Sequence, residues 1–439
     1  MTGGGRRAFV LGGGVAGLAA AFGLADRGFE VTLLESRAWC GGRAFSFVDR
    51  HGGARLDNGP HAMLGCYRAM RQLLQRLGTD GLFARDSALR MAYRTTDGRV
   101  DRLALAALPV PLAMPFGLFG LALPLAARLR ALWGMATVAF GARAERSLAD
   151  WLASRRQLGA PDDYLWRPLC RAIMNVEPDA CAAADFLATL REAFFGRAAS
   201  AAFWLPRRPW GEILADPAPS ALARAGVALR TGARVEAIER SAAGVTALRL
   251  GTGERLALGP HDLAVSALPW FALQKLVPDL AASFGALASA PIVTAHFHVA
   301  TDAAPLPDDG PVVALVAGDP FHFVLRAPGG EPRTFALLSG GNRAFDGRSV
   351  AAIEALARAQ LARHYRGFAA ATPATVRISK ENLATFVAAP GSRALRPAPG
   401  RLPGGPENLH VCGDWTATRL PATLEGAARS AELLLRGLA

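Results

Sequence analysis

The stretch FVLGGGVAGLAAAFGLADRGFEVTLLE, residues 9–35, decides the fold of the N-terminal part of the chain. A short apolar run leads into three glycines, Gly12, Gly14 and Gly17, with the spacing G-x-G-x-x-G. An Ala- and Leu-rich segment follows, and FEVTLLE then has the composition of a second strand that ends in an acid, Glu35. Strand, glycine turn, helix and strand together predict one βαβ unit.

Dinucleotide binding explains why each residue of this pattern is present. Gly12 permits the tight turn, Gly14 lets the backbone approach a pyrophosphate, and Gly17 lets helix and strand pack closely. The helix N-terminus, where we place Ala16, offers free N–H groups and a positive dipole end to phosphates. Glu35 lies eighteen residues beyond Gly17, where a carboxylate can accept ribose hydroxyls.

Three other interpretations of the same stretch explain it less well. A core helix with incidental glycines leaves the acid at the end of the second strand unexplained. A signal peptide would carry its apolar centre where the glycines sit, although Arg6 and Arg7 provide basic residues before it. A membrane helix would be more uniformly apolar.

Composition bounds the class of protein. The chain has 439 residues, enough for two or three domain-sized units. Its formal net charge is +13, but the basic residues are scattered and only two of them, Lys275 and Lys380, are lysines. We therefore expect no nucleic-acid partner, whereas contact with an anionic membrane surface fits this charge.

The cysteines and histidines predict no metal site. Five cysteines are widely spaced without a C-x-x-C pair, which favours reduced thiols in a cytoplasmic protein. His296 and His298 share one face of an expected strand, but no third ligand accompanies them.

The pattern along the chain predicts two interleaved domains. A nucleotide-binding domain is expected from residues 1–85, 221–270 and 396–439, with an antiparallel meander in its middle piece. A second, substrate-binding domain is expected from residues 86–220 and 271–395.

The segment 103–142 is strongly apolar and is interrupted by four prolines, so it does not predict one straight spanning helix. It fits a buried helical layer of the substrate-binding domain. It equally fits an interfacial insertion into one leaflet, with Arg128 and Arg130 toward lipid headgroups.

Two further motifs carry a resemblance to a known family. Gly41-Gly42-Arg43 follows the acid by a short loop, and GDW begins at Gly413. Together they resemble flavoproteins of the amine oxidase and phytoene desaturase superfamily, and within it the hydroxysqualene dehydroxylase family, also called squalene-associated FAD-dependent desaturases. That narrower resemblance rests on LDNGPHAMLGCYR (56–68), LWRPLCRAIMN (165–175), LPRRPWGEILADPA (205–218) and GDWTATRLPATLEGAARS (413–430). The family usually has Gln where this chain has Pro60.

The resemblance implies the fold and the cofactor. It implies an α/β architecture: a Rossmann-like FAD-binding domain of the glutathione reductase type, with a β-meander, and an inserted α+β substrate-binding domain. Arg43 would neutralise the FAD diphosphate, and Asp414 would accept a hydrogen bond from the ribityl chain. Backbone N–H groups of Thr423 and Leu424 would face the flavin N1/O2 edge. The remaining cofactor contacts that it implies are Gly41, Gly42, Gly59, Gly413 and, on the adenine side, Val235.

The resemblance also implies a reaction, the reduction of hydroxysqualene to squalene in squalene and hopanoid biosynthesis. Protonation of an allylic hydroxyl releases water, and hydride from reduced flavin quenches the cation. His61 is our first candidate for the acid and Glu425 the second, because burial raises a carboxyl pKa. Each has a structural alternative: His61 as a turn residue, Glu425 as a carboxylate at a helix N-terminus. Asp57 fits a local Asx turn better than an acid.

Two other functions stay open at this point. A carotenoid (phytoene-type) desaturase, or another FAD-dependent isoprenoid oxidoreductase, would use the same fold. The non-enzymatic alternative is a protein without turnover, either an FAD-dependent scaffold or a lipid-carrying partner of a squalene-forming synthase. For the main hypothesis we expect a long apolar isoprenoid substrate and peripheral contact with the inner face of the cytoplasmic membrane. Association with other squalene-pathway enzymes is a further expectation.

Overall fold

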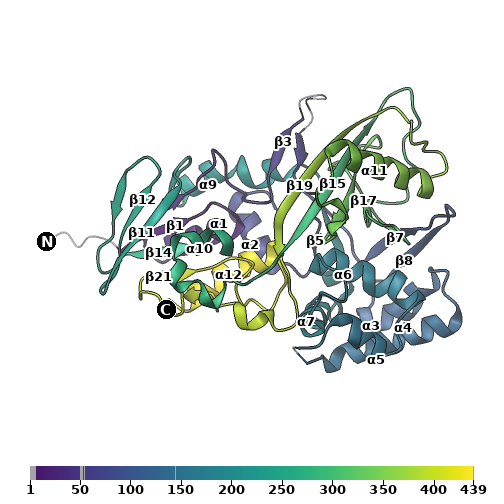
Figure 1. Cartoon of the computed structure of the whole chain (residues 1–439), viewed down its shortest axis with the longest axis horizontal. Coiled ribbons are helices and arrows are strands. Elements are labelled where there is room, and N and C mark those ends of the chain that lie inside the picture. Colours follow the sequence, from purple (N-terminus) through teal and green to yellow (C-terminus); the bar gives the residue numbers. More distant parts are fainter. Residues whose placement is uncertain (1–5, 50–52, 54, 144, 439) are drawn as a thin grey trace.

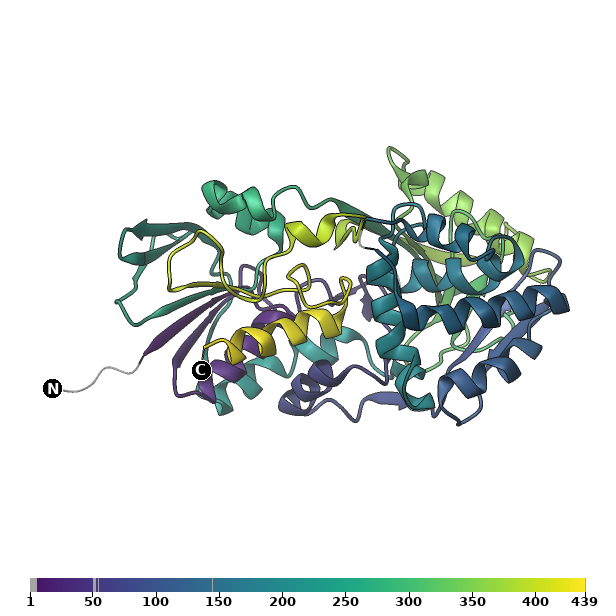
Figure 2. The same cartoon turned by 90° about the horizontal axis from the view of Figure 1, so that it is seen from below.

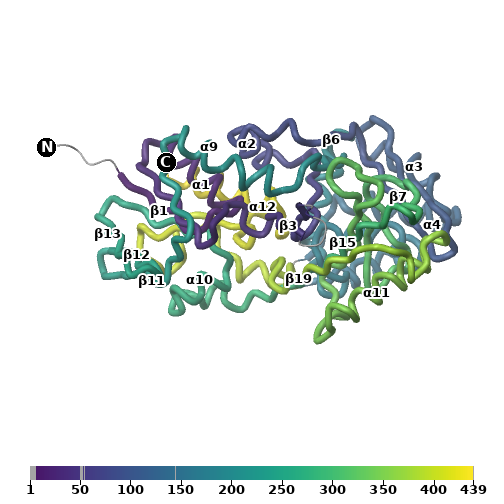
Figure 3. The backbone as a smooth tube through the Cα atoms, turned by 90° about the horizontal axis from the view of Figure 1, so that it is seen from above, coloured from purple at the N-terminus to yellow at the C-terminus, as the bar shows by residue number. Residues whose placement is uncertain are grey.

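The computed structural model describes residues 6–49, 53, 55–143 and 145–438. Residues 1–5 and 439, which the domain prediction included, lie outside the described part. The molecule is elongated, with a parallel sheet and its helices at one end and a second sheet with a helical layer at the other (Figure 1, Figure 3).

The first sheet has the strand order β10-β2-β1-β14-β21-β20. All neighbours in it are parallel except β20 and β21. The helix α1 (Val15–Ala25) connects the two strands that the opening motif predicted. The strands are β1 (Arg7–Leu11), β2 (Glu30–Leu34), β10 (Ala228–Arg230), β14 (Leu263–Ser266), β20 (Gly400–Arg401) and β21 (Leu409–Val411).

Side chains of β1 alternate between two apolar cores. Ala8 and Val10 belong to the core shared with α1 and with α12 (Leu424–Arg436), which lie together on one face of the sheet (Figure 2). Phe9 and Leu11 belong to the core that also contains buried residues of the three-stranded meander. The meander consists of β11 (Val235–Ser241), β12 (Gly244–Leu250) and β13 (Arg255–Ala257). Both faces are therefore covered, which explains why β1 is apolar throughout its centre.

The second sheet has seven strands in the order β19-β15-β18-β17-β16-β7-β8. The longest strands of this sheet, β15 and β19, pair with each other in antiparallel orientation. The helix α11 (Val350–His364) packs on this sheet and shares a separate apolar core with it. The strands are β7 (Arg90–Arg94), β8 (Val100–Ala104), β15 (Ser289–Val299), β16 (Val312–Leu315), β17 (Phe323–Arg326), β18 (Thr334–Gly340) and β19 (Ala374–Phe386).

A layer of helices lies beside the second sheet (Figure 1). It consists mainly of α3 (Val110–Phe119), α4 (Leu125–Thr137), α5 (Leu148–Ser154), α6 (Arg167–Met174) and α7 (Ala183–Phe194). The other helices are α2 (Arg68–Leu77), α8 (Ala198–Ala201), α9 (Ala218–Arg224) and α10 (Trp270–Leu276), and short strands are β3 (Ser46–Val48), β4 (Arg55–Asp57), β5 (Met63–Leu64), β6 (Phe83–Arg85) and β9 (Phe203–Pro206).

The apolar segment 103–142 forms two short helices, α3 and α4, instead of one long one. Pro109 and Pro124 directly precede these helices, where a missing N–H costs nothing, while Pro115 lies inside α3. Across the described residues, every helix is too short or too polar to cross a membrane.

The architecture confirms the predicted fold class: a Rossmann-like parallel sheet with a meander, and a second α+β region. The parallel sheet takes its strands from three separated parts of the chain, residues 7–34, 228–266 and 400–411. The domain boundaries themselves remain our proposal.

A substitution at Gly17 tests how far the fold depends on the glycine turn. A Cβ at this position would lie 1.8 Å from the Gly12 carbonyl oxygen, an overlap that only a backbone shift relieves. We expect Gly17→Ala to lower the free energy of unfolding by about 3 kcal/mol and to reduce the cofactor content, measured by thermal denaturation and absorbance. Gly81→Ala is the matched control, because the described atoms leave open space for its Cβ. Equal stability of the two variants would contradict the prediction.

Candidate functional site

Two glycine segments pack backbone against backbone at the N-terminus of α1. Gly14 forms a β-bridge with Gly41, and the Gly41 N–H donates to the Gly13 carbonyl at 2.8 Å. Gly12, Gly41 and Gly42 have φ values of +100°, +111° and +61°, which L side chains rarely adopt. A Cβ on Gly42 would lie 3.1 Å from the Gly14 Cα. Glycine at position 42 therefore allows this approach, because a side chain there would be both strained and crowded.

The N-terminus of α1 is open to an anion. Its N-cap is Gly14, and no described side chain caps it or adds an acid to its first turn. Ala16 is buried in this first turn. Free amides, a positive helix end and a surrounding backbone without side chains are what a diphosphate requires. The cradle therefore fits the diphosphate of a dinucleotide.

Glu35 is buried at the end of β2 and is held by backbone amides. Its Oε2 accepts from Gly13 N–H at 2.7 Å and its Oε1 accepts from Arg37 N–H at 2.7 Å. The carbonyl of Glu35 accepts from Ala233 N–H at 2.8 Å, which brings the start of β11, with Val235, close to the acid. The predicted ribose and adenine residues thus come together, and their roles remain predictions.

The C-terminal GDW turn joins the N-terminal motif through an ion pair. Arg43 Nη2 lies 2.7 Å from Asp414 Oδ2, and Arg43 Nη1 also donates to the Ala384 carbonyl of β19. Gly413 has φ +144°, and a Cβ there would lie 2.8 Å from the Trp415 indole nitrogen. Two residues that the resemblance assigned to different parts of the cofactor therefore contact each other directly.

The turn before α12 is a helix N-terminus with a side-chain cap. Thr423 is the N-cap, and its hydroxyl accepts from Gly426 N–H at 3.0 Å. Leu424 is the first helical residue. The first amides of a helix have no acceptor within the helix, which suits the flavin contact that the resemblance implies for Thr423 and Leu424. That contact stays a prediction.

Glu425 contacts the N-terminus of another helix. Its carboxylate accepts from the amides of Ala69 and Met70 at 3.2 and 3.0 Å, at the start of α2, and pairs with Arg429 at 3.1 Å. Burial raises its pKa. Both oxygens are engaged in holding α2 against α12, which favours the structural alternative, although the stabilised helix dipole is that of α2.

His61 lies half-buried beside Trp210. The two rings meet edge to face with centroids 5.9 Å apart, and the Trp210 indole N–H donates to the His61 carbonyl at 3.1 Å. Burial, and secondarily the nearby charge of Arg43, lower the pKa of His61 to about 4. At neutral pH the imidazole is therefore neutral, and a proton would have to come from its neutral N–H or from a transiently protonated form.

The turn that carries His61 is fixed on both sides. Asp57 is buried, and its Oδ1 accepts from the Ser46 hydroxyl at 2.6 Å and from Trp210 N–H at 2.7 Å. The expected local Asx turn at Asp57 is therefore wrong, because its carboxylate connects distant segments; burial raises its pKa to about 6. Next to it, the Ser379 hydroxyl of β19 donates to Asn58 at 2.6 Å, which holds the turn and Gly59 against the second sheet.

Arg396 is a residue of the site that sequence reasoning missed. It is buried, and its guanidinium donates to the carbonyls of Trp415, Thr416 and Leu420 at 3.1, 2.6 and 2.8 Å. Burial lowers its pKa to about 10. In the sequence it stands in GSRALRPAPG (391–400), where Arg393 also precedes Pro397, a pattern without specific spacing.

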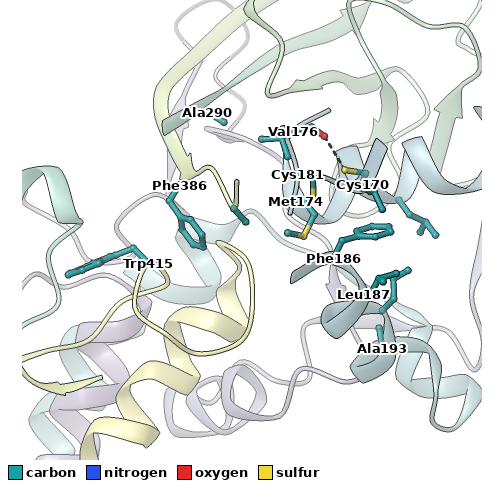
Figure 4. Close-up of a cluster of buried hydrophobic side chains, with 14 of the residues drawn as sticks. Cys170, Met174, Val176, Cys181, Phe186, Leu187, Ala193, Ala290, Phe386 and Trp415 are labelled. Carbon is teal, nitrogen blue, oxygen red and sulfur yellow. Dashed lines mark hydrogen bonds between the residues drawn. The ribbon is translucent and has the colours of Figure 1, made fainter. Parts of the chain in front are cut away.

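An apolar interior joins this site to the helical layer. One cluster of buried side chains includes Phe9 of β1, Trp415 of the GDW turn and residues of α3 to α7. Figure 4 shows Phe386 and Trp415 toward one end of this region and Met174, Cys181 and Phe186 toward the other. Trp415 of the GDW turn therefore belongs to an apolar cluster that extends to the helical layer.

Comparison with known proteins defines the class. The model of the family described as flavin containing amine oxidoreductase matches residues 15–433, so the chain belongs to that family. It is an FAD-dependent oxidoreductase, and the glycine cradle, Glu35 and the GDW turn are the parts of this chain that fit FAD.

The chain is most informatively compared with two bacterial relatives. It is 30% identical to hydroxysqualene dehydroxylase from Rhodopseudomonas palustris, over 96% of this chain and 95% of that protein. It is 28% identical to hydroxysqualene dehydroxylase from Sinorhizobium fredii, with the same coverage. A crystal structure of an oxidoreductase from Methanosarcina mazei has the same fold, with a TM-score of 0.74 at 15% identity and 99% coverage of both chains.

Removal of the buried guanidinium tests whether Arg396 holds the GDW loop. Arg396→Met leaves three carbonyl oxygens without their donor, so we expect the free energy of unfolding to fall by about 2 kcal/mol. We also expect FAD to dissociate faster from the variant, measured by fluorescence of released flavin. Arg401→Met is the control, because that side chain is 56% exposed. Equal flavin retention in the two variants would contradict this role.

Neutralising Glu425 separates its two interpretations. A glutamine retains one acceptor oxygen for the α2 amides, so we expect Glu425→Gln to lose about 1 kcal/mol of stability and to keep its flavin. Turnover should change less than tenfold, whereas loss of a general acid costs roughly a hundredfold or more. Glu432→Gln, which removes a 3.8 Å pair with Arg436 on the same helix, is the control. A hundredfold loss of turnover in a stable Glu425→Gln protein would assign it the catalytic role.

Proposed function

We propose that this protein reduces hydroxysqualene to squalene with loss of water, as a step of squalene and hopanoid biosynthesis. The observation that carries the proposal is the match, over nearly the whole chain, to proteins named for that activity. The apolar interior beside the GDW turn supports it, because a thirty-carbon isoprenoid offers almost only apolar surface to its binding site.

The reaction needs a proton, an exit for water and a hydride. Protonation of the allylic hydroxyl and cleavage of its C–O bond release water and leave an allylic cation, and addition of hydride to that cation gives squalene. The glycine cradle, Glu35 and the GDW turn would hold FAD, whose reduced form would supply the hydride with its electron pair. The chain itself has to bind the isoprenoid, exclude bulk water and deliver the proton.

The residues divide these tasks. The buried aromatic side chains Phe386 and Trp415 would line the substrate and exclude water. His61 remains our first candidate for the proton donor, because the charge of Arg43, which pairs with Asp414 of the GDW turn, acts on its imidazole. Because its pKa is lowered, His61 would be protonated only transiently in each catalytic cycle and would not carry a permanent charge. Glu425 is the weaker candidate, because α2 and Arg429 already occupy its oxygens.

We place the protein at the inner face of the cytoplasmic membrane, where an isoprenoid of this length dissolves. Association with the enzymes that form or use squalene would shorten the path of the intermediate. Both statements rest on the proposed substrate and on the expectation of reduced cysteines in this chain.

An anaerobic single-turnover experiment tests the reaction. The purified holoenzyme is reduced with dithionite and mixed with hydroxysqualene in detergent, and flavin absorbance and lipid products are followed together. We expect flavin reoxidation with one squalene formed per flavin. A flavin that stays reduced while hydroxysqualene persists would overturn the proposal. Oxidised enzyme that is then reduced by a phytoene-type polyene would assign the desaturase function instead.

A further inference from the structure

Exposed apolar side chains are concentrated on one segment of this protein. Of the fourteen large apolar side chains exposed among the described residues, eight lie between residues 108 and 140. We call this set the apolar face; it consists of Leu108, Leu112, Phe116, Phe119, Leu125, Leu129, Trp133 and Phe140. Exposed apolar clusters of this size on a protein mark a contact with another apolar body.

Helix geometry arranges these side chains in two stripes. On α3, Leu112, Phe116 and Phe119 follow at i, i+4 and i+7, and they are 62, 64 and 65% exposed. On α4, Leu125, Leu129 and Trp133 follow at i, i+4 and i+8. Each series lies along one side of its helix, because residues three to four apart are neighbours on a helix surface.

The opposite sides of the same helices are fixed in the protein core. Ala113 and Met114 of α3 and Ala127 and Ala131 of α4 are buried in the main apolar cluster. At Gly134 a Cβ would lie 2.5 Å from the Gln157 side chain, so α4 packs closely on its neighbours. The two helices therefore cannot rotate to bury their outer stripes.

The charged side chains within the segment that carries the apolar face have one sign. Residues 102–142 contain no acid, and Arg102 and Arg130 are exposed at its margin. Arg128 covers the Phe119 ring, with its guanidinium carbon 5.1 Å from the ring centroid. Among the described residues none of these three arginines forms an ion pair with a carboxylate. A partner that is apolar inside and anionic at its surface complements this arrangement.

We propose that the apolar face inserts into one leaflet of an anionic lipid bilayer, with α3 and α4 lying in the interface. The two helices have ten and thirteen residues, too few to cross a hydrocarbon core, but long enough to bury an apolar stripe beneath the headgroups. Trp133 occupies the interfacial level that tryptophan prefers, and Arg102 and Arg130 contact lipid phosphates. The helices α3 and α4 lie at the end of the molecule opposite the meander (Figure 1).

This surface goes beyond the proposed reaction, because it follows from exposure and charge and not from the identity of the substrate. It would let an apolar substrate pass from lipid to protein without crossing water. The helical layer beneath the face belongs to the same apolar cluster as Trp415 of the GDW turn.

Vesicle flotation of the holoenzyme tests the insertion without any substrate. We expect the protein to float with vesicles that contain phosphatidylglycerol and phosphatidylcholine. Replacement of two face residues, Phe116→Gln with Trp133→Gln, should lower the partition coefficient at least tenfold. The matched control is Val350→Gln on α11, where the side chain is 63% exposed but lies outside the face. Flavin absorbance and melting temperature establish that each variant is folded.

The arginines are tested separately. Arg102→Gln with Arg130→Gln should remove most of the preference for anionic over neutral vesicles, while Arg224→Gln with Arg249→Gln, two exposed arginines elsewhere, should preserve it. Wild-type protein that stays unbound at every lipid composition would overturn the proposal. So would a dimer, seen by light scattering, that the Phe116 and Trp133 variants dissociate without any effect on flotation, because a second copy would then cover the face. Flavin turnover in detergent does not enter this test, so failure here is distinct from failure of the proposed reaction.

Discussion

The close approach of two backbone segments at the N-terminus of α1 is the constraint on which the rest of the structure depends. Gly17 lets α1 pack on the turn at Gly12, and Gly14 and Gly41 form a bridge without a side chain between them. A single methyl group at Gly17 would overlap the backbone, so this close packing requires glycine at that position. It leaves the helix amides open to a diphosphate and directs Glu35 toward the same turn.

Backbone groups and arginines then attach the distant C-terminal segment to this turn. Arg43 pairs with Asp414, Arg396 holds three carbonyls of the GDW loop, and Glu425 holds α2 against α12. Each buried charge is satisfied mainly by hydrogen bonds, the condition under which burial of a charge is tolerated. The candidate site is therefore a set of loops fixed by polar contacts beside an apolar interior.

The segment 103–142 shows why an apolar sequence alone leaves its environment undecided. Buried core and lipid contact both select Leu, Phe and Trp, and small residues such as alanine suit a helix in either setting. In the structure each helix has a buried side and an exposed side. Ala113 and Ala131 face the core, while Phe116 and Trp133 face outward. The expected buried layer describes the inner sides of the two helices, and lipid contact of their exposed outer sides stays our proposal.

The sequence by itself determined the βαβ unit and the meander, because glycine spacing and apolar alternation are local signals set by backbone geometry. The full fold class followed from the resemblance of its motifs to a known family. It also identified the segments that carry the cofactor motifs. Only the tertiary structure decided which charges meet: the pairing of Arg43 with Asp414, the use of Glu425 by α2 and the burial of Arg396. These contacts join residues hundreds of positions apart or depend on desolvation, and neither distance nor burial is written in a local pattern.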